Sequence, residues 1–342
     1  MGQYYKVKKK ETYIQSSNGK DKLHVTVWEP QGEIKAILQI SHGMIEMMDR
    51  YDGFAYYMAQ RGILVAGNDH LGHGKTAENI DELGYMNAYD GSRTLVCDLH
   101  RVTVCLKRAY KKLPFFLLGF SMGSFLARRY MSEYGYDKKY PSPYTKGSSI
   151  DGFICMGSGS MPGMLLEIAK LVTLIEKKNH GERYRSKLIT NIGFGTYLLG
   201  IPKKTIVDGE IRYRTDKDWI SRDTHVVDEC NANPYSSFTF TVKGFETLLN
   251  TFSYIQDKQN IARIPKNVPV LFASGEMDPV GHYSKDIRRL FKQYAKYVSN
   301  DVSCFIYDNA RHEIHHELGY KKTLADIYEW IDETIDMMKY SS

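Results

Sequence analysis

Three residue types that cooperate in nucleophilic catalysis follow one another along this sequence, each just after a short apolar run. Ser121 is the centre of a G-x-S-x-G pattern, Asp278 comes later, and His312 comes last. A serine hydroxyl is a weak nucleophile until a base removes its proton, and an acid must orient that base. The residue types and their order therefore predict a nucleophile, an orienting carboxylate and a general base that becomes a general acid.

The residues around Ser121 predict a sharp turn between a strand and a helix. Four apolar residues (115–118) precede the pattern, and residues 125–130 carry apolar side chains at helical spacing. Gly119 and Gly123 leave room where a Cβ atom would collide in such a turn. A chain with 28 glycines can contain the pattern by chance, so this context is what supports Ser121 as a nucleophile.

The acid and the base are both expected in loops that follow strands. A strand at 268–273 precedes Asp278, and a strand at 302–307 precedes His312. We favour Asp278 as the acid because a loop residue beyond the strand end can reach the base. Two neighbouring carboxylates are the alternatives, namely Glu276 and Asp308.

A tetrahedral intermediate would also need two preorganised donors for its oxyanion. The backbone N–H of Met122, directly after the serine, is expected to be one donor. The backbone N–H of Met44, in the loop after the strand at 36–40, is the natural second donor. This chemistry needs no metal and no cofactor.

A competing motif overlaps the expected base, because residues 312–316 read H-E-I-H-H and contain H-E-x-x-H. That zinc signature requires both histidines on one face of an established helix. His312 instead comes directly out of a strand and a turn, so zinc is disfavoured. We interpret His315 and His316 as polar residues of a surface helix, and His282 as a surface residue of the helix after the acid.

Strands and helices alternate over most of the chain, which predicts an α/β fold with a mostly parallel central sheet flanked by helices. A hairpin over 11–28 begins the chain. Further strands are expected at 36–40, 63–67, 115–118, 150–156, 268–273 and 302–307, and helices at 51–61, 93–111, 283–297 and 321–338.

The alternation stops between residues 157 and 252, which predicts a helical cap inserted into a core of residues 1–156 and 253–342. A helix at 161–178 carries apolar residues on one face. We expect this cap to lie above the edge of the sheet where the parallel strands end, which is where open α/β sheets hold ligands. Several cap aromatics would suit an apolar substrate, although more than half are expected to pack the cap itself: Phe194, Tyr197, Tyr213, Trp219, Tyr235, Phe238 and Phe240.

The composition is that of an ordinary globular chain, with 42% hydrophobic and 25% charged residues. The net charge of +6 is spread along 342 residues, so nucleic-acid binding is not expected. We expect neither a cleaved signal peptide nor a membrane span. Five widely spaced cysteines predict reduced, buried thiols and a cytoplasmic location.

Seven separate motifs follow one another along the chain: HGMIEMMDRYDGFAYYMAQRG (42–62), DHLGHG (69–74), GFSMGS (119–124), DWISRD (218–223), NPYSSFTFT (233–241), SGEMDPVG (274–281) and ARHEIHHE (310–317). With these motifs the chain resembles the α/β-hydrolase family of monoacylglycerol lipases, lysophospholipase-like esterases and serine aminopeptidases. The resemblance implies an α/β-hydrolase fold and a hydrolase of lipid-like carboxylic esters, with Ser121, Asp278 and His312 as triad. Met47 and Leu71 depart from the family's HGxxEH and RGHG patterns.

The resemblance leaves three functions open. The first is cleavage of monoacylglycerol or lysophospholipid esters through an acyl-serine, with transient contact between the cap and a membrane surface. The second is a proline-releasing aminopeptidase, whose substrate ammonium would need cap carboxylates such as Glu167, Asp218 and Asp223. The third is a ligand receptor without catalysis. The sequence carries no indication of oligomeric state.

Overall fold

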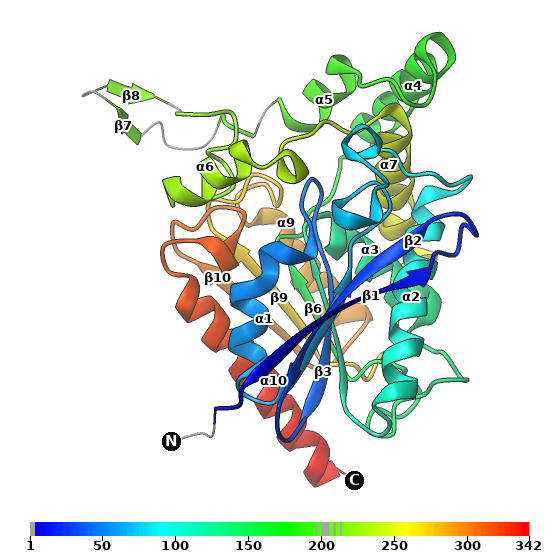
Figure 1. Cartoon of the computed structure of the whole chain (residues 1–342), viewed down its shortest axis with the longest axis vertical. Helices are drawn as coiled ribbons and strands as arrows, with labels where there is room; N and C mark the ends of the chain where they lie inside the picture. Colours follow the sequence, from blue (N-terminus) through cyan, green and yellow to red (C-terminus); the bar gives the residue numbers. More distant parts are fainter. Residues whose placement is uncertain (1–3, 196, 200–204, 208–209, 213, 342) are drawn as a thin grey trace.

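An eight-stranded sheet forms the centre of the molecule, in the order β1-β2-β4-β3-β5-β6-β9-β10 (Figure 1). The structure is a computed structural model that describes residues 4–195, 197–199, 205–207, 210–212 and 214–341. From β4 to β10 neighbouring strands run parallel, whereas β1 and β2 pair antiparallel at one edge. The strands are β1 (Val7–Gln15), β2 (Lys22–Pro30), β3 (Ala36–Ser41), β4 (Ile63–Asn68), β5 (Phe115–Phe120), β6 (Gly152–Met156), β9 (Val270–Gly275) and β10 (Val302–Tyr307).

Helices cover both faces of this sheet, which is why β3, β4, β5, β6 and β9 are buried at every residue. α1 and α10 pack on one face, and α2, α3 and α9 on the other. The helices of the core are α1 (Asp52–Ala59), α2 (Gly91–Ala109), α3 (Met122–Tyr134), α8 (Lys258–Ile261), α9 (Lys285–Tyr297) and α10 (Tyr320–Ser341), with short 3-10 turns η1 (Met48–Tyr51), η2 (Gly74–Thr76), η3 (Ile80–Glu82) and η5 (Ile314–His316).

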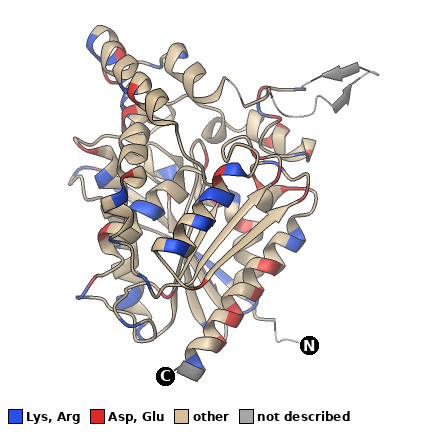
Figure 2. Ribbon diagram, turned by 180° about the vertical axis from the view of Figure 1, so that it is seen from behind, with Lys and Arg blue, Asp and Glu red and all other residues tan. Residues whose placement is uncertain are grey.

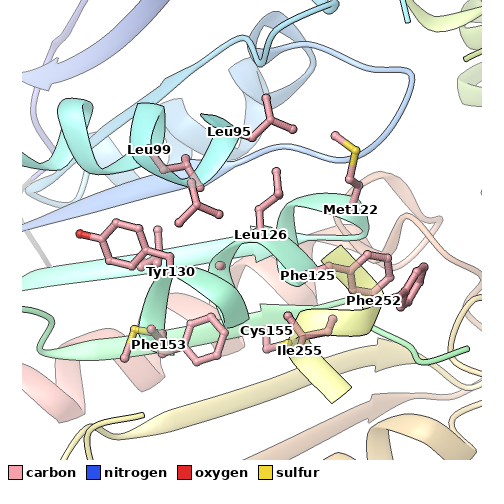
Figure 3. Packing of buried hydrophobic residues seen from close by; sticks show 14 of the residues in the cluster. Leu95, Leu99, Met122, Phe125, Leu126, Tyr130, Phe153, Cys155, Phe252 and Ile255 are labelled. Atoms are coloured by element: carbon pink, nitrogen blue, oxygen red, sulfur yellow. The ribbon is translucent and has the colours of Figure 1, made fainter. Parts of the chain in front are cut away.

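The segment from α4 to α7, between β6 and β9, forms the layer drawn above the sheet in Figure 1. Of its helices, α7 also packs on α2 and α3 of the core. Figure 3 shows Phe252 and Ile255 of α7 beside Phe125 of α3. Its elements are α4 (Gly163–His180), α5 (Lys187–Phe194), β7 (Thr205–Val207), β8 (Glu210–Arg212), α6 (Thr224–Ala232), η4 (Pro234–Ser236) and α7 (Val242–Gln256).

The predicted fold class is confirmed, and most predicted elements lie within two or three residues of their observed bounds. The expected end of the insertion at residue 252 falls inside α7, because that helix continues into the core. All five cysteines are free thiols, but Cys105 is exposed rather than buried as expected. Among the described residues, no helix is both long and apolar enough to cross a bilayer. Basic and acidic residues are interspersed along the ribbon (Figure 2).

Candidate active site

Ser121 lies in a tight turn between β5 and α3 with a backbone that L-residues rarely adopt. Its φ is 51° and its ψ is −123°. A Cβ atom on Gly123 would lie 1.9 Å from the carbonyl oxygen of Ser41, and one on Gly119 would lie 2.4 Å from the oxygen of Gly123. Only glycine fits at these two positions, so the two glycines permit the turn that places Ser121 at the start of α3.

The structure brings Ser121, His312 and Asp278 into a hydrogen-bonded chain. The Ser121 Oγ lies 2.9 Å from the Nε2 of His312, and the His312 Nδ1 lies 2.9 Å from the Oδ1 of Asp278. Asp278 also accepts hydrogen bonds from the Val280 N–H at 2.9 Å and the Ser274 hydroxyl at 3.3 Å. These bonds fix the carboxylate, which in turn orients the imidazole toward the serine.

The charges around His312 suit a general base. Burial by itself lowers the pKa of His312, but the carboxylate of Asp278 outweighs burial and raises that pKa above its ordinary value of 6.5. His312 and Asp278 are both almost completely buried. The carboxylate would therefore stabilise the imidazolium that would form if His312 took the proton of Ser121.

The two alternative carboxylates lie elsewhere. Glu276 is exposed and accepts a hydrogen bond from the N–H of Asn309 at 3.0 Å. Asp308 is also exposed, at the end of β10. The geometry thus favours Asp278 as the partner of His312.

The loop after β3 lies directly against Ser121. A Cβ atom on Gly43 would lie 3.1 Å from the Cβ of Ser121. The buried Glu46 carboxylate holds this loop, because it accepts hydrogen bonds from the Gly43 N–H and, at 2.9 Å, from the Tyr51 hydroxyl. Met44 lines the same cavity as Ser121, as does Met122.

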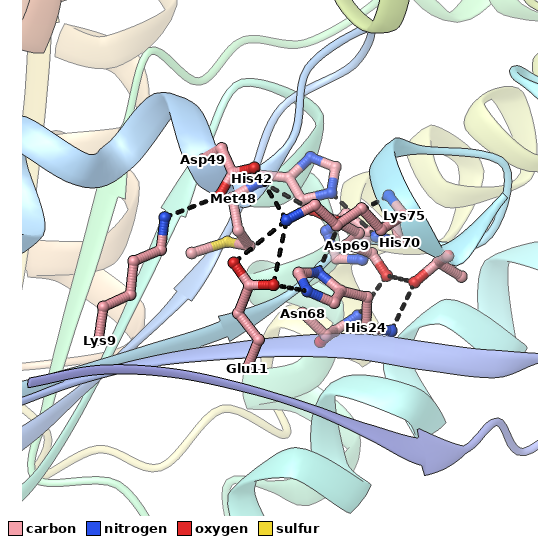
Figure 4. Close-up of polar contacts among 11 residues, drawn as sticks. Lys9, Glu11, His24, His42, Met48, Asp49, Asn68, Asp69, His70 and Lys75 are labelled. Atoms are coloured by element: carbon pink, nitrogen blue, oxygen red, sulfur yellow. Dashed lines mark hydrogen bonds and ion pairs between the residues drawn. The ribbon is translucent and has the colours of Figure 1, made fainter. Parts of the chain in front are cut away.

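Behind this loop a second buried carboxylate, Asp69, connects it to the edge of the sheet (Figure 4). Asp69 accepts hydrogen bonds from the backbone N–H of Met48 at 2.8 Å and of Lys75 at 2.9 Å, and lies 3.0 Å from the His24 Nδ1. His24 also contacts Glu11 of β1 at 3.3 Å. The edge hairpin thus supports the loop that carries Met44.

Ser121 and His312 open into a cavity of about 190 Å³ between the core and the inserted segment. One part of it is apolar and is lined from α3, α4, α5 and α7. Another part is polar and is lined from the loop after β3 with η1, from the segment before α6, from α6 and η4, and from the loop after β10. The apolar lining includes Phe125, Leu165, Ala169, Ile189, Ile192, Phe245, Leu249 and Phe252, and the polar lining includes Glu46, Arg50, Lys217, Cys230, Ser236 and Glu313.

The aromatic residues predicted to bind substrate divide into two groups. Phe194, Tyr197 and Trp219 line the cavity, and the ring of Trp219 lies 5.2 Å from that of His312. Tyr235 and Phe238 are not among the described residues that line it. Phe238 instead packs on the rings of His73 and Phe240, and Phe240 is fully buried. Tyr213 lies outside the described residues.

Sequence reasoning missed the polar part of the cavity. Arg50 donates hydrogen bonds to Glu313 and to the sulfur of Cys230, although these residues are distant in the chain. Glu313 directly follows the predicted base, and Arg50 lies in a family motif, so both positions carried a signal. No sequence signal pointed to Cys230 or Lys217.

The H-E-x-x-H residues have other partners than a metal. Both ring nitrogens of His312 are occupied by Asp278 and Ser121. His315 is not on the surface helix that we expected, because it lies in η5, is 2% exposed and stacks on Tyr51 at 5.1 Å. His316 lies 3.2 Å from Arg50.

His282 also differs from its interpretation as a residue of the following helix. It precedes α9 and is half exposed, as a surface residue would be, but it also lines the cavity. With Tyr283 and Ser284 it forms three consecutive residues of positive φ, a conformation that the sequence did not predict.

Comparisons with known proteins agree with this fold. Residues 32–319 match the family model described as "Serine aminopeptidase, S33". Monoglyceride lipase from Rattus norvegicus is 24% identical over 311 residues, which are 90% of this chain and 86% of the relative.

Two solved structures share the architecture. A thermostable carboxyl esterase from Bacillus coagulans superposes with a TM-score of 0.82 and 24% identity, over 96% of this chain and 99% of that one. A soluble variant of monoglyceride lipase from Saccharomyces cerevisiae does so with a TM-score of 0.69 and 17% identity, over 97% and 96%. The family resemblance of the motifs is confirmed, and the chain belongs to the serine aminopeptidase S33 family of α/β-hydrolases.

Proposed function

We propose that this protein hydrolyses carboxylic esters of monoacyl lipids through an acyl-serine intermediate, with Ser121, Asp278 and His312 as its triad. The observation that carries the proposal is the Ser121–His312–Asp278 hydrogen-bond chain at the base of a largely apolar cavity. The names of the relatives, which include monoglyceride lipases and a carboxyl esterase, support the same reaction class.

In the proposed mechanism the Ser121 oxygen attacks the ester carbonyl carbon while the Nε2 of His312 takes the serine proton. The backbone N–H groups of Met44 and Met122 stabilise the oxyanion, and losing one such donor typically costs about 3 kcal/mol. The intermediate collapses when His312 protonates the leaving alcohol. Water, deprotonated by His312, then releases the fatty acid and restores the serine.

The cavity suggests how the substrate lies. An acyl chain would occupy the apolar part, where Phe125 and Phe252 pack with rings 4.5 Å apart. The alcohol would lie in the polar part next to His312, since this residue must protonate the leaving oxygen. Arg50 and Glu313 line that part.

We further propose that residues 157–252 act as a cap and that its helix α4 contacts membrane surfaces. The apolar residues of α4 that suggested a packed face are largely exposed, for example Met164 at 81% and Leu171 at 58%. Leu165 of the same helix lines the cavity and is 38% exposed. This continuity gives a lipid a path from a membrane into the cavity.

The test is labelling with a fluorophosphonate, combined with a turnover screen over monoacylglycerols, lysophospholipids and short esters. Wild-type protein should label at Ser121 and turn over esters, and Ser121→Ala should do neither while keeping its melting temperature. Ser237→Ala is the matched control because Ser237 is exposed and lies outside the triad. Absence of labelling in the wild type would favour a non-catalytic ligand receptor.

The aminopeptidase alternative gains no support from its candidate carboxylates. Asp218 accepts hydrogen bonds from the N–H groups of Arg214 and Thr215, and Asp223 caps α6. Glu167 is largely exposed on α4. None of the three is among the described residues lining the cavity, so esters should be turned over faster than proline naphthylamide.

A further inference from the structure

The polar part of the cavity is lined by two carboxylates, Glu46 and Glu313, and by two cationic side chains, Arg50 and Lys217. The Arg50 guanidinium donates to Glu313, and its Nε lies 3.8 Å from the Oε2 of Glu46. The Lys217 ammonium donates to the backbone carbonyl of Cys230 at 3.1 Å and of Ser236 at 2.8 Å. The formal charges of these four side chains cancel.

The ion pair between Arg50 and Glu313 is largely withdrawn from solvent. The Arg50 side chain is 13% exposed and that of Glu313 is 8% exposed. Although burial disfavours the charged form of Glu313, the Arg50 guanidinium outweighs burial and holds the pKa of Glu313 well below its ordinary range. Glu313 is therefore an anion that faces the cavity.

We propose that Glu313 is a specificity-determining residue that restricts the polar part of the cavity to uncharged alcohols and excludes anionic head groups. This inference rests on the proposed function, because it assumes that the alcohol of an ester lies there. A free guanidinium would bind a phosphate through two parallel hydrogen bonds. Glu313 occupies Arg50 instead, so an incoming phosphate must displace a carboxylate.

Displacement is unfavourable for a physical reason. A buried carboxylate that loses its partner keeps its desolvation cost, and two anions side by side repel each other. Specificity of this kind arises from the repulsion between Glu313 and an anion as much as from favourable contacts with an uncharged alcohol. The adjoining surface groove shares Arg50 and Ser236 with the cavity, and Asp49 and Glu229 also line it.

The test exchanges the charges one at a time in the full-length chain. Glu313→Gln removes the carboxylate that accepts the Arg50 hydrogen bond and leaves only Glu46, at 3.8 Å, beside the guanidinium. Arg50→Gln leaves Glu313 without its guanidinium partner, and the double variant restores neutrality. The two probes share one acyl chain: 1-lauroylglycerol is uncharged, and 1-lauroylglycerol 3-phosphate is anionic. The readout is the ratio of kcat/KM for the anionic ester to that for the neutral ester.

We expect Glu313→Gln to raise this ratio at least tenfold above wild type, mainly through a lower KM for the phosphate ester. The double variant should return to the wild-type ratio, and Arg50→Gln should fall below it. If Glu313 had only a structural role, its substitution would lower the activities toward both esters together. Fluorophosphonate labelling of Ser121 and the melting temperature would then fall as well.

An unchanged ratio in Glu313→Gln, or a raised ratio that persists in the double variant, would overturn the inference. If Glu313→Gln does not fold, the double variant and Arg50→Gln still decide, since their ratios must differ in the stated order. Failure of the wild type to hydrolyse either ester would instead count against the proposed function.

Discussion

Ser121 owes its proposed reactivity to a backbone that is strained at a single residue. A non-glycine residue at a φ of 51° and a ψ of −123° costs of order 1–3 kcal/mol, and such strain persists only when the surroundings enforce it. Here the enforcing contacts come from β3, because the carbonyl of Ser41 lies against Gly123. The crossing of β3 and α3 therefore fixes the geometry of the nucleophile.

A larger residue at Gly123 should push β3 and α3 apart. Gly123→Ala would place a Cβ atom 1.9 Å from a backbone oxygen, so we expect a loss of about 1–3 kcal/mol in the free energy of unfolding and a large loss of kcat. Gly163→Ala is the control, because a Cβ atom there meets nothing within 4 Å. Chemical denaturation and ester turnover measure both effects, and equal stability of the two variants would contradict the argument.

The raised pKa of His312 should set the pH dependence of the proposed reaction. His312 must be neutral to accept the serine proton, so kcat/KM should rise with pH around a midpoint above 6.5. Asp278→Asn removes the carboxylate that raises the pKa, and kcat should fall by roughly 10⁴-fold. A pH–rate profile of both proteins measures this, and a flat wild-type profile between pH 5.5 and 8.5 would exclude a histidine base.

At the scale of elements, the sequence indicated the parts of the site whose position follows from strand order. Strands of a parallel sheet end at one edge, so the order of the motifs along the chain was enough to place Asp278 and His312 near Ser121. Contacts made by loops and by the cap could not be predicted. Arg50 and Cys230 meet across 180 positions, and the exposed apolar residues of α4 have the same spacing as a packed face.

The contact between the edge hairpin and the loop behind the site should respond to pH. Burial lowers the pKa of His24, but hydrogen bonds to Asp69 and Glu11 outweigh burial and raise it. A raised pKa means that the stabilisation is complete below the unfolded value near 6.5 and declines as pH rises through the folded value. His24→Gln removes this stabilisation, so the free energy of unfolding should fall by about 1–3 kcal/mol at pH 6.

The check is the melting temperature of wild type and His24→Gln at pH 6 and pH 9. The difference between the two proteins should be smaller at pH 9. His225→Gln is the control, because the His225 side chain is 81% exposed and should give no difference at either pH. A His24→Gln effect that grows with pH would show that the sign of the pKa shift is wrong.

At the scale of the whole molecule, the core and the inserted segment contribute different parts of the proposed site. The core contributes Ser121, Asp278, His312 and the loop after β3, whereas the inserted segment contributes most of the apolar wall and an exposed apolar helix. An exposed apolar surface costs free energy in water unless something covers it. Because α4 both lines the cavity and faces outward, we assign that covering role to a lipid surface during substrate uptake.

The membrane contact can be separated from catalysis by substitutions on α4 that lie away from the cavity. Leu171 and Leu174 are 58% and 63% exposed, and each should contribute on the order of 1 kcal/mol when partly inserted. Leu171→Glu combined with Leu174→Glu should lower vesicle binding at least tenfold, while turnover of soluble p-nitrophenyl acetate stays unchanged. Tyr297→Glu, equally exposed at 58% at the end of α9, should bind vesicles like wild type. Sedimentation with phosphatidylcholine vesicles measures binding, and equal binding of all three proteins would remove α4 as the docking face.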